Sequence, residues 1–270
     1  MENHIYEGDC LTIAPTLPAG SFDLVLTDPP YNTSGQSMKW ENKQDGGNWY
    51  KMNEEWDTFS FEEYLQFTRL WIRAVDPLLK PNGTVMVCCS QHNLSEVMIT
   101  LKEMRYKCLN IITWKKTNPM PNMTRRVFTH STEFIAWFAK GSNYTFNYEA
   151  MKKYNKGKQL RDVWEFPVCQ GKERIRREDN RAAHPTQKPL ALFARLVEAA
   201  TQPGDLVLDP FIGSGTTAEA CLRLGRKFTG IEAQPEYCRI ARERVRQVLS
   251  EPEYTDDLFT MLNIREENSP

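Results

Sequence analysis

The chain has 270 residues, of which 40% are hydrophobic and 26% charged, with a net charge of −1. This composition is typical of a globular protein, and the length suffices for one large domain or two small ones. No apolar run approaches the roughly 20 residues that span a bilayer, and the first residues lack a signal-peptide pattern, so we expect a cytoplasmic protein without a membrane partner. Seven cysteines without metal-ligand spacing predict reduced thiols and no metal site.

Short apolar runs alternate along the chain with longer segments of helical spacing. The predicted strands are Ile5–Glu7, Asp23–Leu26, Thr84–Cys88, Ile111–Trp114, Phe134–Phe138, Leu206–Leu208 and Lys227–Ile231. The predicted helices are Phe61–Leu79, His92–Met104, Leu190–Thr201, Thr216–Leu224 and Pro235–Leu249. Strands that alternate with helices indicate an α/β fold with a mostly parallel sheet covered on both faces.

Three segments depart from this alternation, and we expect all of them to belong to a single domain over residues 1–270. The polar segment 33–58 is predicted to be a substrate-facing loop, because so long a loop is usually functional or mobile. Segment 143–183 is predicted to be an insertion, and the range Lys152–Lys188 carries a net charge of +6. Segment 251–270 is an acidic tail with a net charge of −5. The charges suit an anion-binding face, although a solvated surface also explains so short a basic run.

A glycine-rich turn follows the predicted strand Leu206–Leu208. It reads Phe-Ile-Gly-Ser-Gly, and Gly213 and Gly215 let the backbone approach a ligand closely at the start of the next helix. The following strand ends at Glu232, seventeen residues after Gly215. A carboxylate at that position can accept hydrogen bonds from both ribose hydroxyls of an adenosine cofactor.

Two cofactor classes fit this turn. The spacing Gly213-x-Gly215-x-x-Ala218 satisfies the dinucleotide fingerprint, so a dinucleotide-dependent oxidoreductase is one alternative. Asp209, directly before the turn, would repel a pyrophosphate but attract the sulfonium and ammonium groups of S-adenosylmethionine. The run "HPTQKP", His184–Pro189, offers hydroxyl, amide and ammonium donors for the carboxylate of such a ligand.

The predicted strand Asp23–Leu26 runs into the sequence Asp28-Pro29-Pro30-Tyr31. Proline has no backbone N–H, so this corner presents a carboxylate and a backbone carbonyl as acceptors, held by fixed φ angles. Such a corner suits the amino group of adenine or cytosine, and the ring of the base can stack on Tyr31. The base must first leave its duplex. We therefore hypothesise methyl transfer to a base amino group, with a proline-stiffened turn as the structural alternative.

The motifs "DPPY", "HPTQKP" and "DPFIGSGTT" together resemble those of the β-class amino-group DNA methyltransferases, in which the catalytic motif precedes the cofactor motif. The resemblance covers Ile5 to about Val248. It implies a circularly permuted, seven-stranded, Rossmann-like methyltransferase sheet, S-adenosylmethionine as cofactor and DNA as partner. It also implies that Asp28, Pro29, Pro30 and Tyr31 form the catalytic pocket and that segment 143–183 recognises the target.

The resemblance assigns a set of residues to the cofactor, with Asp9 on its adenine amine and Cys10 beside it. The set is Asp9, Cys10, Asp28, His184, Thr186, Gln187, Lys188, Asp209, Pro210, Phe211, Gly213, Ser214, Gly215, Thr216, Glu232 and Ala233. Asp9 also fits the N-cap of a short helix, and both roles can coexist.

Six arginines are expected to contact DNA phosphates or guanine: Arg125, Arg126, Arg174, Arg176, Arg177 and Arg181. Within the resembled family, Asp at the first pocket position favours adenine N6, whereas cytosine-N4 enzymes more often carry Ser. The expected activity is therefore adenine-N6 methylation, with cytosine-N4 methylation as the alternative. The family further suggests a homodimer, a cognate restriction endonuclease as partner and GATC as the recognition sequence.

Overall fold

A computed structural model describes residues 1–32, 59–122 and 125–251 of the chain. The predicted loop 33–58 lies outside the described residues. So does the acidic tail, apart from its first residue, Glu251.

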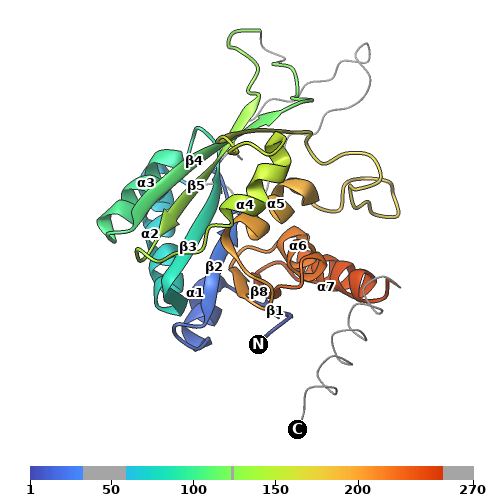
Figure 1. Ribbon diagram of the computed structural model, residues 1–270. Coiled ribbons are helices and arrows are strands. Elements are labelled where there is room, and N and C mark those ends of the chain that lie inside the picture. The colour runs from blue at the N-terminus through green and yellow to red at the C-terminus, as the bar shows by residue number, and fades with distance from the viewer. Residues whose placement is uncertain (33–58, 123–124, 252–270) are drawn as a thin grey trace.

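The described strands form one sheet (Figure 1). They are β1 (His4–Glu7), β2 (Phe22–Thr27), β3 (Leu79–Cys89), β4 (Lys107–Lys116), β5 (Thr132–Ala139), β6 (Val163–Phe166), β7 (Leu206–Asp209) and β8 (Lys227–Glu232). Their order across the sheet is β1-β8-β7-β2-β3-β5-β4-β6. Strand β5 is antiparallel to both of its neighbours, and the other strand pairs are parallel. The mostly parallel α/β sheet predicted from the sequence is confirmed.

Within the described residues the sheet has eight strands rather than the seven that were expected. The additional strand, β6, lies inside segment 143–183 and pairs in parallel with β4 at the sheet edge. It has only four residues, and Trp164 and Phe166 are buried while Val163 and Glu165 are exposed. So short a stretch with two aromatic residues carries little periodic signal, which is why the sequence did not predict it. The basic segment thus contributes a strand to the sheet.

Helices cover both faces of the sheet (Figure 1). They are α1 (Cys10–Ile13), α2 (Phe61–Val75), α3 (Leu94–Glu103), α4 (Tyr148–Met151), α5 (Leu190–Ala200), α6 (Thr216–Arg223) and α7 (Pro235–Leu249). Helices α2 and α3 pack together on one face, with α1 beside α2. Helices α5, α6 and α7 pack in sequence against the other face. Within the described ranges, no helix is long and apolar enough to cross a membrane.

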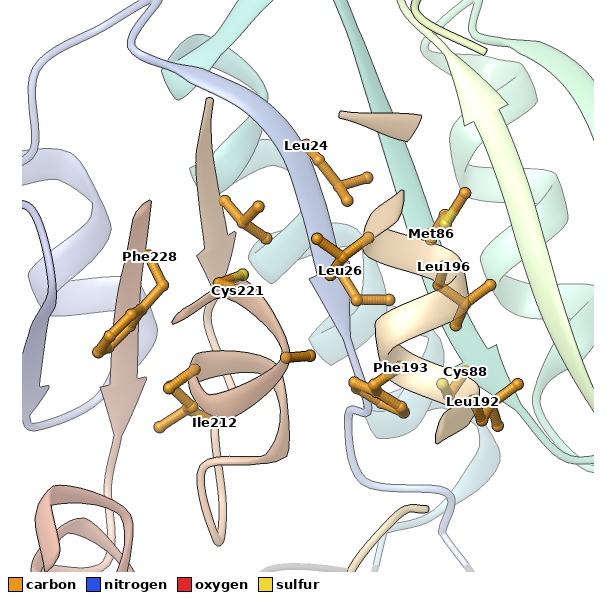
Figure 2. Close-up of a cluster of buried hydrophobic side chains, with 14 of the residues drawn as sticks. Leu24, Leu26, Met86, Cys88, Leu192, Phe193, Leu196, Ile212, Cys221 and Phe228 are labelled. Carbon is orange, nitrogen blue, oxygen red and sulfur yellow. The ribbon is translucent and has the colours of Figure 1, made fainter. Parts of the chain in front are cut away.

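Strand β2 is buried on both faces. Its sequence is a continuous apolar run for this reason. Leu24 and Leu26 point into the core that α5 closes, where Phe193 packs beside them (Figure 2). Val25 belongs to the opposite core, which Trp71 of α2 fills. These side chains are almost fully buried, and each contributes about 1.5–3 kcal/mol of transfer free energy.

Helix α2 has clear start and stop signals. Ser60 and Glu63 form a reciprocal capping box at its N-terminus. The helix ends at Val75, four residues before the predicted end, because Pro77 has no N–H for the helical ladder. Residues Asp76–Leu78 form a 3-10 turn, and Leu79 already begins β3. The helix is therefore shorter, and the strand longer, than the sequence suggested.

Candidate active site

A cavity of about 370 Å³ opens beyond the C-terminal ends of β2, β7 and β8. Ligands of open parallel sheets bind at this edge. The residues expected at the cofactor line this cavity, with the exception of Gly215, and so do the four residues of the catalytic motif. Segments from both halves of the sequence thus meet around one space.

The glycine turn and the end of β8 form one wall of the cavity. Gly213 has φ +51° and donates its N–H to Oε2 of Glu232 at 2.9 Å. Oε1 of Glu232 accepts the N–H of Gln234 at 2.8 Å. These bonds orient the carboxylate and leave each oxygen a lone pair for a ligand hydroxyl. Burial raises the pKa of Glu232.

Gly215 has a packing role rather than a place in the cavity lining. It is the N-cap of α6 with φ +82°, and a Cβ atom there would lie 3.1 Å from Cα of Ala241 in α7. Only glycine combines this backbone conformation with so close an approach of α7. The second glycine of the motif therefore fixes the contact between two helices.

Asp209, at the end of β7, is held by groups of the chain itself. Oδ1 accepts hydrogen bonds from Thr27 Oγ1 at 2.8 Å and from the Phe211 N–H at 3.1 Å. Thr217 Oγ1 donates to Oδ2. Burial raises the pKa of Asp209 to about 7. Asp209 therefore ties β2, β7 and α6 together and also presents a titratable carboxyl group to the cavity.

The "HPTQKP" run lines the cavity, and two of its predicted donors also contact the chain itself. Gln187 accepts the N–H of Ile175 at 2.9 Å and donates to the carbonyl of Glu173 at 2.8 Å, so it ties down the basic segment. The Lys188 ammonium pairs with Oδ2 of Asp28 at 2.5 Å. Both polar groups therefore have partners within the chain, and their contact with a ligand carboxylate stays a prediction. His184 packs edge-on against Tyr237, and burial lowers its pKa to about 3.

The N-terminal motif places Asp9 and Cys10 at the cavity. Oδ1 of Asp9 accepts the Leu11 N–H at 2.7 Å, which makes Asp9 the N-cap of α1. The alternative role considered from the sequence is therefore present. Cys10 is 5% exposed, and burial raises its pKa to about 12, so its thiol stays neutral.

The corner after β2 carries Asp28, Pro29, Pro30 and Tyr31. The Pro30 carbonyl accepts the Tyr64 hydroxyl at 2.8 Å, and Asn93 donates to Tyr64 at 2.9 Å. Oδ1 of Asp28 is buried and has no hydrogen-bond partner among the described residues. Burial raises the pKa of Asp28, and the Lys188 ammonium opposes this rise. A buried acceptor without a partner is costly, so a donor that reached Oδ1 would remove this cost.

Glu133, at the start of β5, was missed by the sequence analysis. It lies 2.6 Å from Lys116 Nζ and accepts the Tyr31 hydroxyl at 3.3 Å. Burial raises the pKa of Glu133, but Lys188 and Lys116 outweigh this effect, so the net shift is downward. The sequence signal for Glu133 is a carboxylate near the start of an otherwise apolar strand, "EFIAWF".

The six arginines expected at DNA do not act as one group. Arg125 and Arg126 are exposed between β4 and β5, close to Phe128, which is 97% exposed. Arg174 instead donates to the carbonyls of Pro185 at 2.8 Å and His184 at 3.2 Å, so it holds the "HPTQKP" run.

The remaining three arginines are exposed but engaged with neighbours. Arg176 donates to the Asn180 carbonyl at 2.8 Å, and Arg177 lies 3.0 Å from Glu236. Arg181 is exposed and pairs loosely with Asp179 at 3.5 Å. Their charges remain accessible to a polyanion, because surface ion pairs contribute little and exchange readily.

Comparison with known proteins gives a consistent answer. A family model described as DNA methylase, for N6 and N4 methyltransferases, matches residues 22–243. The type II methyltransferase M2.DpnII of Streptococcus pneumoniae is 44% identical over 232 residues, which cover 83% of this chain and 82% of that protein. The type II methyltransferase M2.LlaDCHI of Lactococcus lactis subsp. cremoris is 42% identical over 248 residues, covering 89% and 88%.

Solved structures agree with the sequence comparisons. The crystal structure of the M1.HpyAVI–SAM complex matches with a TM-score of 0.66 and 31% identity, and the match covers 90% of this chain and 98% of that one. These matches overturn the dinucleotide-dependent alternative and confirm S-adenosylmethionine as the cofactor class. The chain belongs to the family of DNA methylases that use S-adenosylmethionine to methylate the N6 or N4 amino group of a DNA base.

Proposed function

We propose that this DNA methylase acts on the N6 amino group of adenine and that the corner Asp28–Tyr31 holds the target base. The observation that carries the proposal is Oδ1 of Asp28, which is buried at the cavity wall without a hydrogen-bond partner among the described residues. An amino group that donates to this oxygen removes the cost of leaving it unpaired.

The residues at the cavity fit S-adenosylmethionine. The glycine turn lets the backbone approach the ligand, and the Glu232 oxygens have capacity left for the ribose hydroxyls. Asp9 and Cys10 line the end that we assign to the adenine ring. The cofactor supplies an electrophilic methyl group on a positively charged sulfur. Ionised Asp209 adds negative potential to the wall of the cavity, which favours a cationic ligand.

The corner orients the target amine. Because the Pro30 carbonyl is taken by Tyr64, we assign the second acceptor to the Pro29 carbonyl, beside Asp28 Oδ1. Two acceptors outside the ring plane turn the nitrogen lone pair toward the methyl group, and Tyr31 offers a ring for stacking. The reaction would form a nitrogen–carbon bond as the sulfur–carbon bond breaks, with S-adenosylhomocysteine as the leaving group, and one amine proton would pass to water.

Adenine is preferred over cytosine because Asp28 occupies the position at which the resembled cytosine-N4 enzymes more often carry Ser. Cytosine-N4 methylation remains the second candidate, since the matched family includes both reactions.

DNA contacts are assigned to exposed residues only. Arg125 and Arg126 project from the loop between β4 and β5, and Glu133 ties the end of this loop to the catalytic corner through Tyr31. Segment 143–183, with Arg176, Arg177 and Arg181, serves as the target-recognition region. Arg174 is left out because its guanidinium binds carbonyls of the chain. Phosphate contacts of these side chains supply affinity, and base contacts supply specificity.

The cellular setting follows from the type II relatives and the DNA substrate. We propose a cytoplasmic enzyme of a restriction–modification system, with a cognate restriction endonuclease as functional partner. We further propose that it forms a homodimer and recognises GATC. Sequencing of methylated DNA identifies the motif, and analytical ultracentrifugation determines the number of copies.

The direct test is to methylate DNA with the purified protein and S-adenosylmethionine, digest the DNA to nucleosides and identify them by mass spectrometry. We expect N6-methyladenine, and none in reactions without the cofactor. Finding N4-methylcytosine alone would replace the proposal by the second candidate, and finding no modified nucleoside on any DNA tested would contradict both.

A further inference from the structure

Four charged side chains from separate segments meet beside the catalytic corner. Lys188 Nζ lies 2.5 Å from Oδ2 of Asp28 and 3.8 Å from Oε2 of Glu133. Lys116 Nζ lies 2.6 Å from Oε1 of Glu133. The side chains of Lys188, Asp28, Glu133 and Lys116 are 7%, 17%, 16% and 17% exposed. Two cations and two anions therefore balance in a largely desolvated space, where charges interact strongly.

Glu133 contacts two groups of the target pocket without lining the cavity itself. Its Oε2 accepts the Tyr31 hydroxyl and faces the Lys188 ammonium. The same ammonium lies 4.9 Å from the centre of the Tyr31 ring. One carboxylate thus fixes both the stacking ring and the cation that binds Asp28.

We propose that Glu133 is a positioning residue for methyl transfer: it holds Lys188 on Oδ2 of Asp28, and so keeps Oδ1 turned to the target amine. This proposal rests on the proposed function, because it takes the Asp28 corner as the site of the amine. Burial raises the pKa of Asp28, while Lys188 lowers it and so favours the ionised carboxylate, which offers only acceptors. Lys116 balances the charge of Glu133, so the network stays neutral.

A different reading makes Lys188 a plug that fills the place of the amine and leaves when the base arrives. Two observations favour the positioning role. Lys188 takes only one oxygen of Asp28 and leaves the other without a partner among the described residues. In addition, the ammonium contacts Glu133 at 3.8 Å and lies 4.9 Å from the centre of the Tyr31 ring, whereas a plug must withdraw easily.

The two neighbours act on Asp28 in opposite directions. Burial raises the pKa of Asp28, Lys188 lowers it and Glu133 raises it. The other titratable groups that interact with Asp28 are Tyr31, Cys88 and Cys89 of β3, and Asp209 of β7. Loss of the Lys188 charge therefore raises the pKa of Asp28. Loss of Glu133 removes a carboxylate that raises this pKa but also frees Lys188, which lowers it, so its two effects on Asp28 oppose each other. Because transfer needs ionised Asp28, the acid limb of the rate profile follows these shifts.

The experiment compares Glu133→Gln and Lys188→Met in the full-length protein. Single-turnover methyl-transfer rates are measured from pH 5 to 9, together with the binding of S-adenosylhomocysteine and the KM for DNA. We expect both variants to lose at least about tenfold in kcat, with cofactor binding and the KM for DNA within about threefold. The acid limb moves to higher pH in Lys188→Met. Glu133→Asp recovers part of the rate.

The matched control is Glu103→Gln, which removes an exposed carboxylate that pairs with Arg69 at 3.0 Å between helices α3 and α2. We expect wild-type rates from it. Circular dichroism and thermal unfolding establish that each variant folds. Should Glu133→Gln not fold, Lys116→Met takes its place. This variant leaves the Glu133 charge uncompensated, so its acid limb moves to higher pH as its rate falls.

Two results overturn the proposal. One is a folded Glu133→Gln variant with wild-type kcat. The other is a Lys188→Met variant with a lower KM for DNA and an undiminished rate, which supports the plug. If the wild-type protein gives no methylated nucleoside, the proposed function fails instead, so the two failures are distinguishable.

Discussion

The Tyr64 hydroxyl donates a 2.8 Å hydrogen bond to the carbonyl of Pro30 and so ties the catalytic corner to α2. Asn93 donates to the same hydroxyl at 2.9 Å, which extends the tie to the segment before α3. The corner is therefore fixed by elements outside the motif. The orientation of the corner at the cavity depends on these hydrogen bonds.

Tyr64→Phe removes that tie but keeps the ring in the core. The Asn93 amide and the Pro30 carbonyl lose a partner, so we expect a loss of about 1–3 kcal/mol in the free energy of unfolding. A less rigid corner also lowers kcat by about tenfold, while S-adenosylhomocysteine binding stays unchanged. Urea unfolding, rate measurements and calorimetry check the three values. A variant that is destabilised with an unchanged kcat would show that the tie supports the fold and not the corner.

Gly215→Ala tests the packing role of the second glycine. The new Cβ atom meets Cα of Ala241 at 3.1 Å, and φ is +82°. Backbone strain of about 1–2 kcal/mol and overpacking of about 1–3 kcal/mol should add up. Gly225→Ala is the matched control, since φ is +67° but nothing lies within 4 Å of its Cβ position. We expect Gly225→Ala to show the strain alone in urea unfolding, and equal losses would refute the contact between α6 and α7.

The pKa of Asp209 predicts a pH dependence of cofactor binding. Burial raises this pKa to about 7, so the free protein carries a proton on Asp209 below neutral pH. A cationic ligand favours the ionised carboxylate, and its affinity therefore increases as the pH rises through 7, by about tenfold between pH 6 and 8. Calorimetric titration with S-adenosylmethionine measures the slope. Asp209→Asn should retain only the slope that comes from the ligand's own groups, so an unchanged slope in this variant would contradict the assignment.

The arginines divide into two groups with different expected effects. Arg126→Ala removes an exposed charge, so we expect weaker DNA binding on any sequence and a salt slope that is smaller by about 1. Arg174→Ala removes bonds to the carbonyls of His184 and Pro185, so we expect lower thermal stability with an unchanged salt slope. Fluorescence anisotropy at several salt concentrations separates the two. A reduced slope in Arg174→Ala would return this residue to the DNA contacts.

The sequence predicted the parallel sheet and its site edge because strong local signals mark them. The apolar run of β2 is followed by two prolines, and the turn after β7 contains two glycines that adopt positive φ. Local signals of this kind depend on neighbouring residues only. They located most elements to within a few residues. They also predicted that the cofactor and catalytic motifs lie at the same edge of the sheet, and both motifs line one cavity.

The parts that the sequence did not predict depend on contacts between distant segments. Lys188 reaches Asp28 across 160 residues, and Arg174 turns inward to the "HPTQKP" run. Charge alone does not say whether a lysine or an arginine faces solvent or a buried partner. For the same reason Glu133 escaped notice, since its partners lie on β4, on the corner after β2 and before α5.

The central claim is that Asp28 acts on the target base and not on the cofactor. Single-turnover methyl transfer by Asp28→Ala, measured alongside its affinity for S-adenosylhomocysteine, tests this claim most directly. We predict that transfer to DNA is abolished while the affinity stays within about tenfold of the wild type, or ~1.4 kcal/mol. Methyl transfer at the wild-type rate by the folded variant would contradict the account.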